Sequence, residues 1–380
     1  MSKPLSASDL GALNFQQRMQ FLRYGKRMQK NLITTTEAVG GTSRIQLFNV
    51  GVLTKLLLEV TCDITIGTAI AVPSSFAPYN LIRRLKVQDY DGTDRVNVSG
   101  FQLWTLNSVR GKRFYGGNNQ SGTAVFTNPV VPTAVGNGQI RFFIEVPIAF
   151  DVDNPDLKLQ DTRGAIMSQT NVGQMFLNID WNTSLYANGN IDSVYSGAAT
   201  TTVVGQNASP ITVTVWQQYI MPQPVPGSNQ VVLPLADLQT VYELAGGVRS
   251  TDNLAVNSEK LLDWPNVREV IGAYYNYVTA GAVAQGNMSQ FRMIVNGNTV
   301  ITDDSELSML FKMRQSLNTD LVAGAYFFDK RHEPVQTAIY GNVQSGLTPA
   351  TVSGGNQYVE LMYESFWPKG IALPGIAQAG

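Results

Sequence analysis

Apolar and polar residues alternate with a period of two over much of the chain. In the clearest run, Lys55–Ile66, every second residue is apolar: Leu56, Leu58, Val60, Cys62, Ile64 and Ile66. Similar runs occupy residues 142–150, 175–181 and 211–219. Successive side chains of a strand point to opposite faces of its sheet, so this pattern predicts half-buried β-strands. The sequence therefore predicts an all-β protein.

A different period is found near the amino terminus, in residues 8–30. Five apolar residues share one face at helical spacing, and four basic residues share the opposite face. The apolar set is Leu10, Leu13, Phe21, Tyr24 and Met28, and the basic set is Arg23, Lys26, Arg27 and Lys30. This spacing predicts an amphipathic helix. Such a helix can dock on its own subunit, on a neighbouring subunit or on a membrane surface.

The charge of the chain is nearly balanced but unevenly distributed. The net charge is −1, which favours no nucleic-acid partner. Residues 1–36 contain six basic residues, Arg18 among them, against Asp9 alone. This segment therefore carries +5 and the remainder −6. Charged residues make up only 14% of the chain. Gly, Asn, Thr, Ser and Gln take their place, as is typical of a β protein with long polar loops.

One pattern occurs twice, in residues 82–111 and 291–317. Each copy predicts a strand, a tight turn, a second strand and a helix, with turns at Asp91-Gly92 and Asn296-Gly297. Ser99 with Gln102, and Asp303 with Glu306, have the spacing of helix capping boxes. We expect Trp104 and Phe311 to occupy comparable places, each on the helix that packs beside its own sheets.

Three further matches follow in the same order and indicate duplication of one β-rich domain. AYFFD (325–329) matches RFFIEVPIAFD (141–151), AIYGN (338–342) matches NIDWN (178–182), and VELMYESF (359–366) matches TVTVWQQY (212–219). We expect two fused eight-stranded jelly rolls with short flanking helices. The predicted division is an amino-terminal helical arm (1–43), a first jelly roll (44–220), a linker (221–230), a second jelly roll (231–368) and a tail (369–380).

Candidate catalytic and metal-binding residues are few. The sole histidine, His332, lies in the charged stretch DKRHEP, without the partners of a catalytic triad or a zinc site. Asp89, Asp91 and Asp94 resemble a fragment of a calcium loop, but a hairpin turn accounts for Asp-Gly. The single cysteine, Cys62, falls in an alternating strand and is expected in the core. We expect no catalytic residue, cofactor or metal.

No signal peptide or membrane-spanning segment is predicted, so we expect synthesis and folding in a cytoplasm.

Three segments resemble the major capsid proteins of tectiviruses, which are bacteriophages. The segments are FAPYNLIRRLKVQDYDGT (76–93), VVLPLADLQTVYEL (231–244) and YFFDKRHEPVQTAIYGNV (326–343). The resemblance does not extend to the amino-terminal arm or to the loops 116–138 and 186–210. These capsid proteins belong to the double jelly-roll lineage that includes adenovirus hexon. The resemblance implies pseudo-hexagonal trimers that tile an icosahedral shell around an internal membrane, with no known catalytic role.

On this basis we expect a major capsid protein located in the virion shell. Its expected partners are other copies in the homotrimer and in neighbouring capsomers, penton and minor capsid proteins, and lipids of the internal membrane, with no specific nucleic acid. The arm is the candidate site for contact with the membrane or with neighbouring capsomers. Its contact residues are Arg18, Arg23, Lys26, Arg27, Lys30, Leu10, Leu13, Phe21 and Met28.

Two alternatives come from other classes of protein. A carbohydrate-binding or glycan-cleaving β-sandwich would need an aromatic groove or a pair of carboxylates about 5–10 Å apart. A spike or fibre-type attachment module would be present in few copies per particle.

Overall fold

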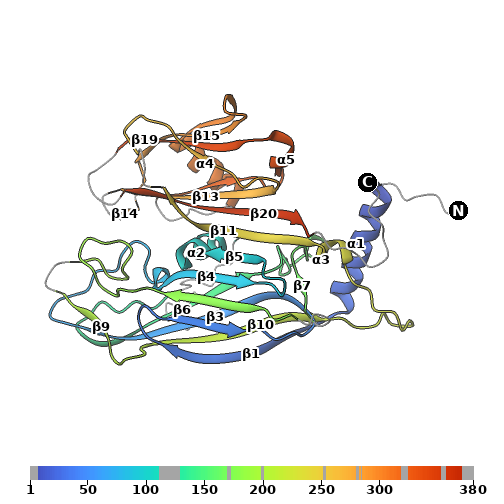
Figure 1. Cartoon of the computed structure of the whole chain (residues 1–380), viewed down its shortest axis with the longest axis horizontal. Coiled ribbons are helices and arrows are strands. Elements are labelled where there is room, and N and C mark those ends of the chain that lie inside the picture. The colour runs from blue at the N-terminus through green and yellow to red at the C-terminus, as the bar shows by residue number, and fades with distance from the viewer. Residues whose placement is uncertain are drawn as a thin grey trace, which may run out of the picture.

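Two jelly rolls and an amino-terminal helix form the chain. A computed structural model describes residues 7–110, 129–168, 173–197, 201–250, 254–279, 282–283, 285–317, 324–351 and 357–369 (Figure 1). Each jelly roll consists of two sheets that enclose apolar side chains. The predicted all-β double jelly roll is therefore confirmed. The predicted tail, from residue 370 onwards, and residues 111–128 of the predicted 116–138 loop lie outside the described residues.

In the first jelly roll, one sheet has the strand order β1-β10-β3-β6 and the other β2-β8-β4-β5. The strands of the first sheet are β1 (Lys26–Glu37), β10 (Ile211–Met221), β3 (Val52–Ile66) and β6 (Gly136–Pro147). Those of the second are β2 (Thr42–Gln46), β8 (Phe176–Trp181), β4 (Ile82–Gln88) and β5 (Asp94–Val98).

The second jelly roll repeats this arrangement. Its first sheet has the order β11-β20-β13, with β17 paired to β13, and its second sheet has the order β12-β19-β15-β16. The first set is β11 (Thr240–Ser250), β20 (Tyr358–Pro368), β13 (Glu269–Thr279) and β17 (Ala325–Asp329). The second set is β12 (Lys260–Asp263), β19 (Val343–Pro349), β15 (Met288–Val295) and β16 (Thr299–Ser305).

Helices and short strands complete the fold. The helices are α1 (Ala7–Tyr24), α2 (Gly100–Val109), α3 (Leu235–Leu238), α4 (Glu306–Leu317) and α5 (Thr337–Tyr340), with the 3₁₀ turns η1 (Tyr79–Leu81) and η2 (Leu157–Leu159). The short strands are β7 (Ile166–Met167), β9 (Val203–Gly205), β14 (Ala282–Val283) and β18 (Val335–Gln336).

The alternating pattern forms the core as expected. Leu56, Leu58 and Val60 of β3 are fully buried, whereas the residues between them are partly exposed. Leu58 and Val60 lie opposite Val215 and Val213 of β10, so the inner face of this sheet is apolar along these residues. Cys62 is buried in the same row, as predicted.

The duplicated unit is confirmed. Residues 82–109 form β4, β5 and α2, and residues 288–317 form β15, β16 and α4. Ser99 and Gln102 form the predicted capping box at the start of α2, where each side chain accepts a hydrogen bond from the other residue's backbone N–H. In both jelly rolls, the helix joins the last strand of this hairpin to the next strand of the sandwich.

Three details of the predicted repeat are wrong. Asp303 does not cap α4, because it lies in β16; the backbone N–H of Ser308 instead donates to the Ser305 hydroxyl (3.2 Å). Phe311 is 69% exposed and is not a core residue like those of α2. Residues 338–342 do not form the counterpart of β8: Thr337–Tyr340 is the helix α5, and the equivalent strand is β19.

The predicted helix over 8–30 is too long. Helix α1 ends at Tyr24, and β1 begins at Lys26. Gly25 lies so close to β10 that a Cβ atom there would be 2.5 Å from the Ile220 side chain. From Lys26 onwards the backbone pairs with β10, which satisfies more backbone groups than a solvent-exposed helix end would. The first jelly roll therefore contains residues 26–37, which the sequence assigned to the arm.

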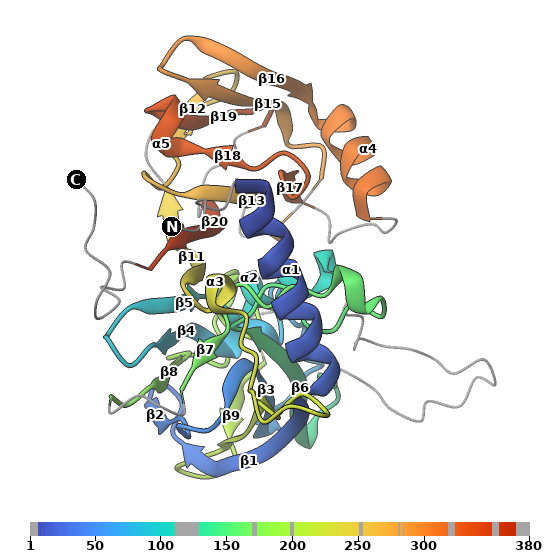
Figure 2. The ribbon, with the colours of Figure 1, turned by 90° about the vertical axis from the view of Figure 1, so that its right-hand side faces the viewer.

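The sheets are stacked as layers, with the sheet containing β1 at one end and the sheet containing β15 and β19 at the other (Figure 1). Helix α1 stands at the side of this stack, next to α3 (Figure 2), and its amino-terminal half extends away from the sheets (Figure 1).

Candidate functional site

The junction between the two jelly rolls is a continuous sheet. Strand β5 of the first jelly roll pairs in parallel with β11 of the second, where Val96 lies opposite Leu244 and Asn97 opposite Ala245. This pairing joins the edges of two sheets into a single sheet of ten strands. The two domains are therefore fixed side by side by backbone hydrogen bonds.

Helix α2 is enclosed at this junction. Eight of its ten residues are buried, including the polar Gln102 and Thr105. The Gln102 side-chain amide donates to the backbone carbonyl of Leu361 on β20 (3.0 Å), so the residue that caps α2 also contacts the second jelly roll. On its other side α2 packs against β6 and β4 of its own domain.

An arginine at the end of α2 inserts into the outer face of the second jelly roll. Arg110 donates to Glu364 and to the Tyr242 hydroxyl, and the hydroxyls of Tyr242 and Tyr274 both donate to the Glu364 carboxylate at 2.7 Å. Burial alone would lower the pKa of Arg110, but Glu364 holds it above its ordinary value. Burial raises the pKa of both tyrosines well above 10.

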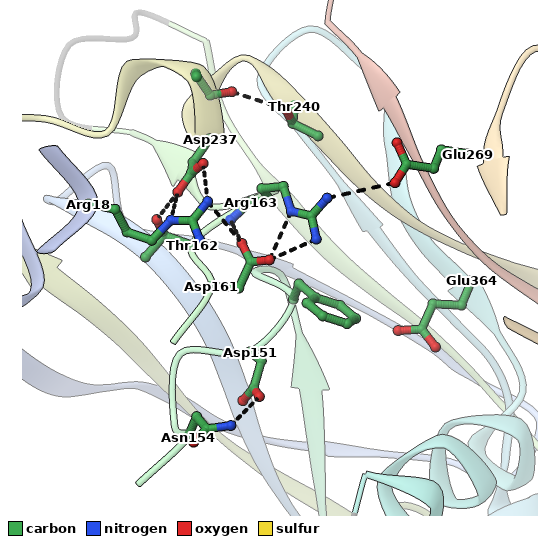
Figure 3. Close-up of polar contacts among 12 residues, drawn as sticks. Arg18, Asp151, Asn154, Asp161, Thr162, Arg163, Asp237, Thr240, Glu269 and Glu364 are labelled. Atoms are coloured by element: carbon green, nitrogen blue, oxygen red, sulfur yellow. Dashed lines mark hydrogen bonds and ion pairs between the residues drawn. The ribbon is translucent and has the colours of Figure 1, made fainter. Parts of the chain in front are cut away.

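A second set of contacts surrounds this ion pair. The guanidinium of Arg163 lies 4.0 Å from the centre of the Phe366 ring, and Phe366 packs edge-on against Phe150 at 5.3 Å. Arg163 also pairs with Asp161 (2.8 Å) and reaches Glu269 at 3.8 Å (Figure 3). Phe150, Asp161 and Arg163 belong to the first jelly roll and Phe366 and Glu269 to the second, so these contacts also cross the junction.

Helix α1 is fixed to the junction by Arg18. Its guanidinium donates to both carboxylate oxygens of Asp237 in α3, at 2.6 and 2.8 Å, and Asp237 also accepts from the Thr162 hydroxyl at 2.5 Å (Figure 3). Asp237 is 4% exposed, so a second partner compensates its burial. Burial would lower the pKa of Arg18, but the hydrogen bond to Asp237 raises it.

The structure separates the predicted contact residues of the arm into two groups. Leu10, Leu13, Arg18, Phe21 and Arg23 lie on α1, whereas Lys26, Arg27, Met28 and Lys30 lie on β1. The expected single helix with an apolar face and a basic face is therefore not present. Its residues have different surroundings and different roles.

Only the amino-terminal half of α1 exposes its apolar residues. Phe21 and Leu22 are buried in a small core with Ile220 and other residues of the first jelly roll. Leu10 is 47% exposed, Leu13 is 41% exposed and Phe15 is 44% exposed. The carboxyl-terminal half of α1 is thus an anchor, and the other half is an apolar projection.

The basic residues of β1 contact the first jelly roll. Arg27 donates to the Gln160 side chain at 2.7 Å and to the Val152 carbonyl at 3.1 Å. The Lys30 ammonium lies 4.0 Å from the centre of the Phe48 ring. Lys26 is exposed at the beginning of the strand.

The aspartates of the β4–β5 hairpin form ion pairs with basic side chains of the same chain. Asp89 is bound by Arg95 (2.6 Å) and by Lys369 (2.8 Å), and Asp91 by Lys369 at 2.7 Å. Asp94 pairs with Lys86. The turn predicted here is confirmed, and the three carboxylates balance the positive charges of Arg95, Lys369 and Lys86.

His332 is exposed, beside a shallow cavity of about 260 Å³ that Lys312 and Asp329 also line. Among the described residues, no three His, Cys, Asp or Glu side chains are placed to share a metal ion. No helix in the described ranges has the length and hydropathy needed to cross a membrane.

A larger cavity of about 580 Å³ opens at the junction beyond the end of the β5–β11 pairing. Its lining is mostly polar and includes Asn80, Arg83 and Asp192. The two aromatic residues that line it, Phe76 and Phe101, are each 2% exposed. They therefore offer no stacking surface for the sugar ring that a glycan-binding protein would hold.

Comparison with known proteins agrees with this architecture. The family model for the amino-terminal domain of the P3 major capsid protein matches residues 26–222, and that for its carboxyl-terminal domain matches residues 239–373. The major capsid protein P3 of Enterobacteria phage PRD1 is 26% identical over 338 residues, which cover 84% of this chain and 81% of the phage protein.

Solved structures show the same fold. The major capsid protein of Sulfolobus turreted icosahedral virus aligns over 92% of this chain and 100% of its own, with a TM-score of 0.66 and 13% identity. The major capsid protein P2 of bacteriophage PM2 covers 93% of this chain and 100% of its own, with a TM-score of 0.51 and 10% identity. With matching family models over both jelly rolls, the chain belongs to the P3 major capsid protein family.

Proposed function

We propose that three copies of this chain form a pseudo-hexagonal capsomer, and that these capsomers tile an icosahedral shell over an internal lipid membrane. The observation that carries the proposal is the edge-to-edge junction of two similar jelly rolls within one chain. Three such chains supply six similar domains, which suit a lattice position with six neighbours. Other capsomers, penton proteins and minor capsid proteins are the proposed partners of this unit.

The proposed role is structural. The charged groups at the junction bind one another across the two domains: Arg110 with Glu364, and Arg163 with Glu269. These ion pairs therefore hold the two domains together, which is a structural function suited to a protein of a capsid shell.

We place α1 beneath the shell, with its amino-terminal half in contact with lipid. Leu10, Leu13 and Phe15 are exposed on a helix that projects from the sheets, while Arg18 and Phe21 fix its base. An exposed apolar segment on an anchored helix can insert into the boundary between headgroups and acyl chains. Arg23 and Lys26, near the base, would face the anionic headgroups.

The proposed domain division follows from the same contacts. The arm comprises residues up to Tyr24, and the first jelly roll begins with β1 at Lys26. The linker follows β10, and the second jelly roll begins near α3 and β11.

Native mass spectrometry of the folded protein tests the oligomer. The expected result is a species of three times 41.5 kDa. A chain that remains monomeric at micromolar concentration would exclude the proposed capsomer.

Co-sedimentation with vesicles containing anionic lipid tests the arm. A variant lacking residues 1–16 retains Arg18 and Phe21 but loses the exposed apolar residues. We expect this variant to lose vesicle binding while it still forms trimers. Binding equal to that of the full chain would exclude the lipid contact and leave neighbouring capsomers as the partner of α1.

A further inference from the structure

The two jelly rolls differ in the outer face of one sheet. In the second jelly roll, the outer face of the sheet containing β20 is covered by the first jelly roll. In the first jelly roll, the outer face of the sheet containing β10 is not covered. Strand β20 has nine consecutive buried residues, because its inner face contacts its own core and its outer face contacts the first jelly roll. Glu364 and Phe366 are on that outer face, where they meet Arg110 and Phe150. The equivalent strand of the first jelly roll, β10, alternates between buried and partly exposed residues, so its outer face is uncovered.

The uncovered face of the first jelly roll has an apolar centre. Trp216 of β10 lies directly opposite Leu57 of β3, and both side chains are partly exposed. Two carboxylates, Glu59 and Asp63, follow Leu57 on the same face of β3. This surface lies at the β1 end of the stack of sheets (Figure 1).

In the second jelly roll, helix α4 lacks the cover that α2 has in the first. Leu307 is 78% exposed and Phe311 is 69% exposed, and their spacing of four places them on one face of the helix. Arg314 lies on the same face in the last turn, as Arg110 lies at the end of α2. The opposite face of α4 packs Met309 and Met313 into the core.

The strands that pair at the internal junction also have unpaired counterparts at the edges of the other two sheets. Inside the chain, β5 pairs with β11. The corresponding strands of the other two sheets are β16 and β1, and each is the terminal strand of its sheet. The edge β16 carries the exposed Val300 and Ile301, and the edge β1 carries the exposed Ile33.

We infer that the outer face of the first jelly roll, centred on Trp216 and Leu57, binds α4 and the β16 edge of a second copy of this chain. The contact repeats the internal junction: α4 takes the place of α2, and Arg314 faces Glu59 and Asp63 as Arg110 faces Glu364. Because the two surfaces differ, the contact is head-to-tail and can be closed by a ring of copies. The inference rests on the proposed trimer and names the residues that hold it together.

Site-directed cross-linking tests the pairing. Cys62 is buried, so introduced cysteines are the reactive ones. W216C and F311C are prepared as separate proteins, mixed, and treated with a short bismaleimide. We expect covalent dimers in the mixture, fewer with either variant alone, and covalent trimers with the double variant. Mixed and single samples that cross-link equally would overturn the head-to-tail arrangement.

Substitution in α4 provides a second test with a matched control. Leu307 and Ile339 are both 78% exposed in the second jelly roll, but Ile339 lies on α5, away from α4 (Figure 2). We expect L307D with F311D to weaken trimer formation at least tenfold in sedimentation velocity, and I339D to leave it unchanged. R314E is expected to weaken it as well, and E59R in the same chain to restore part of the loss.

The outcomes separate the two proposals. If the wild-type chain is trimeric and the L307D/F311D variant remains equally trimeric, the trimer stands and this docking surface is wrong. If the wild-type chain is monomeric, both the capsomer and the docking surface are excluded. Circular dichroism of each variant shows whether it is folded, and since the substituted side chains are exposed, we expect wild-type spectra.

Discussion

Arg110 and Glu364 are 254 residues apart in the chain and form a buried ion pair between the two jelly rolls. Their side chains are only 9% and 1% exposed. The Glu364 carboxylate also accepts hydrogen bonds from Tyr242 and Tyr274, so both of its oxygens have partners. The cost of removing this charge from water is therefore offset only while every partner is present.

Loss of Arg110 is expected to destabilise the protein strongly. Arg110→Met leaves the Glu364 carboxylate buried without its cation, and removal of one member of a buried pair costs about 3–5 kcal/mol. Urea denaturation followed by fluorescence gives the change in unfolding free energy. Arg83→Met, at an exposed arginine, is the control and should change stability by no more than about 0.5 kcal/mol. Equal stability of the two variants would mean that the pair contributes nothing.

Stability is expected to decrease at alkaline pH. Burial raises the pKa of Tyr242 and Tyr274 well above 10, so the folded chain keeps protons that the unfolded chain releases. This contribution is fully present below pH 10, the ordinary pKa of tyrosine, and is lost as pH rises above it. Urea midpoints measured between pH 8 and pH 11 should fall in the upper part of that range. A constant midpoint would contradict the buried, protonated state of these hydroxyls.

The position at which the chain is truncated should decide whether it folds. Removal of residues 1–16 leaves Arg18, Phe21 and the whole of β1 in place, so we expect a folded protein with nearly unchanged thermal stability. Removal of residues 1–36 also deletes most of β1 and uncovers the edge of β10. We expect that variant to aggregate or to lose its cooperative melting transition, because an exposed strand edge pairs with other chains. Circular dichroism melts and gel filtration measure both, and a stable product of the longer deletion would show that β1 is dispensable.

Arg18 should control the order of α1 without controlling the fold. Arg18→Ala removes two charge-assisted hydrogen bonds to Asp237, each of a type worth about 1.5–3 kcal/mol. Thr162 still binds Asp237, so the jelly rolls should remain folded. Hydrogen exchange is expected to become faster in α1, while β3 stays protected. Arg23→Ala, at an exposed position of the same helix, is the control, and equal exchange in the two variants would mean that Arg18 does not anchor α1.

The period-two pattern and the internal repeat were sufficient to predict the fold. Leu56, Leu58 and Val60 indicate a half-buried strand because burial on one face requires that spacing, and the Ser99–Gln102 box marks the start of α2 by local hydrogen bonding alone. The prediction of helix after Tyr24 is wrong because Met28 continues the helical spacing by coincidence. Its conformation is decided by pairing with β10, nearly two hundred residues away in the chain.

The contacts that build the junction could not be predicted in the same way. Glu364 lies within a run of nine buried residues in β20, and a buried carboxylate needs a partner, but nothing local identifies Arg110 as that partner. Phe311 shows that the burial of an apolar residue also cannot be predicted from the sequence alone. Its apolar side chain looks like part of a core in the sequence, yet whether it is covered depends on which surface lies opposite.

The parallel pairing of β5 with β11 also affects how concentration governs assembly. Free domains that meet in solution lose translational and rotational freedom, at a cost of about 4–15 kcal/mol for each association. Inside one chain this contact forms during folding, whatever the protein concentration. In the proposed trimer, three of the six contacts between jelly rolls are therefore complete before any two molecules meet. Only the other three respond to dilution, to salt, or to the amount of protein that an infected cell has made.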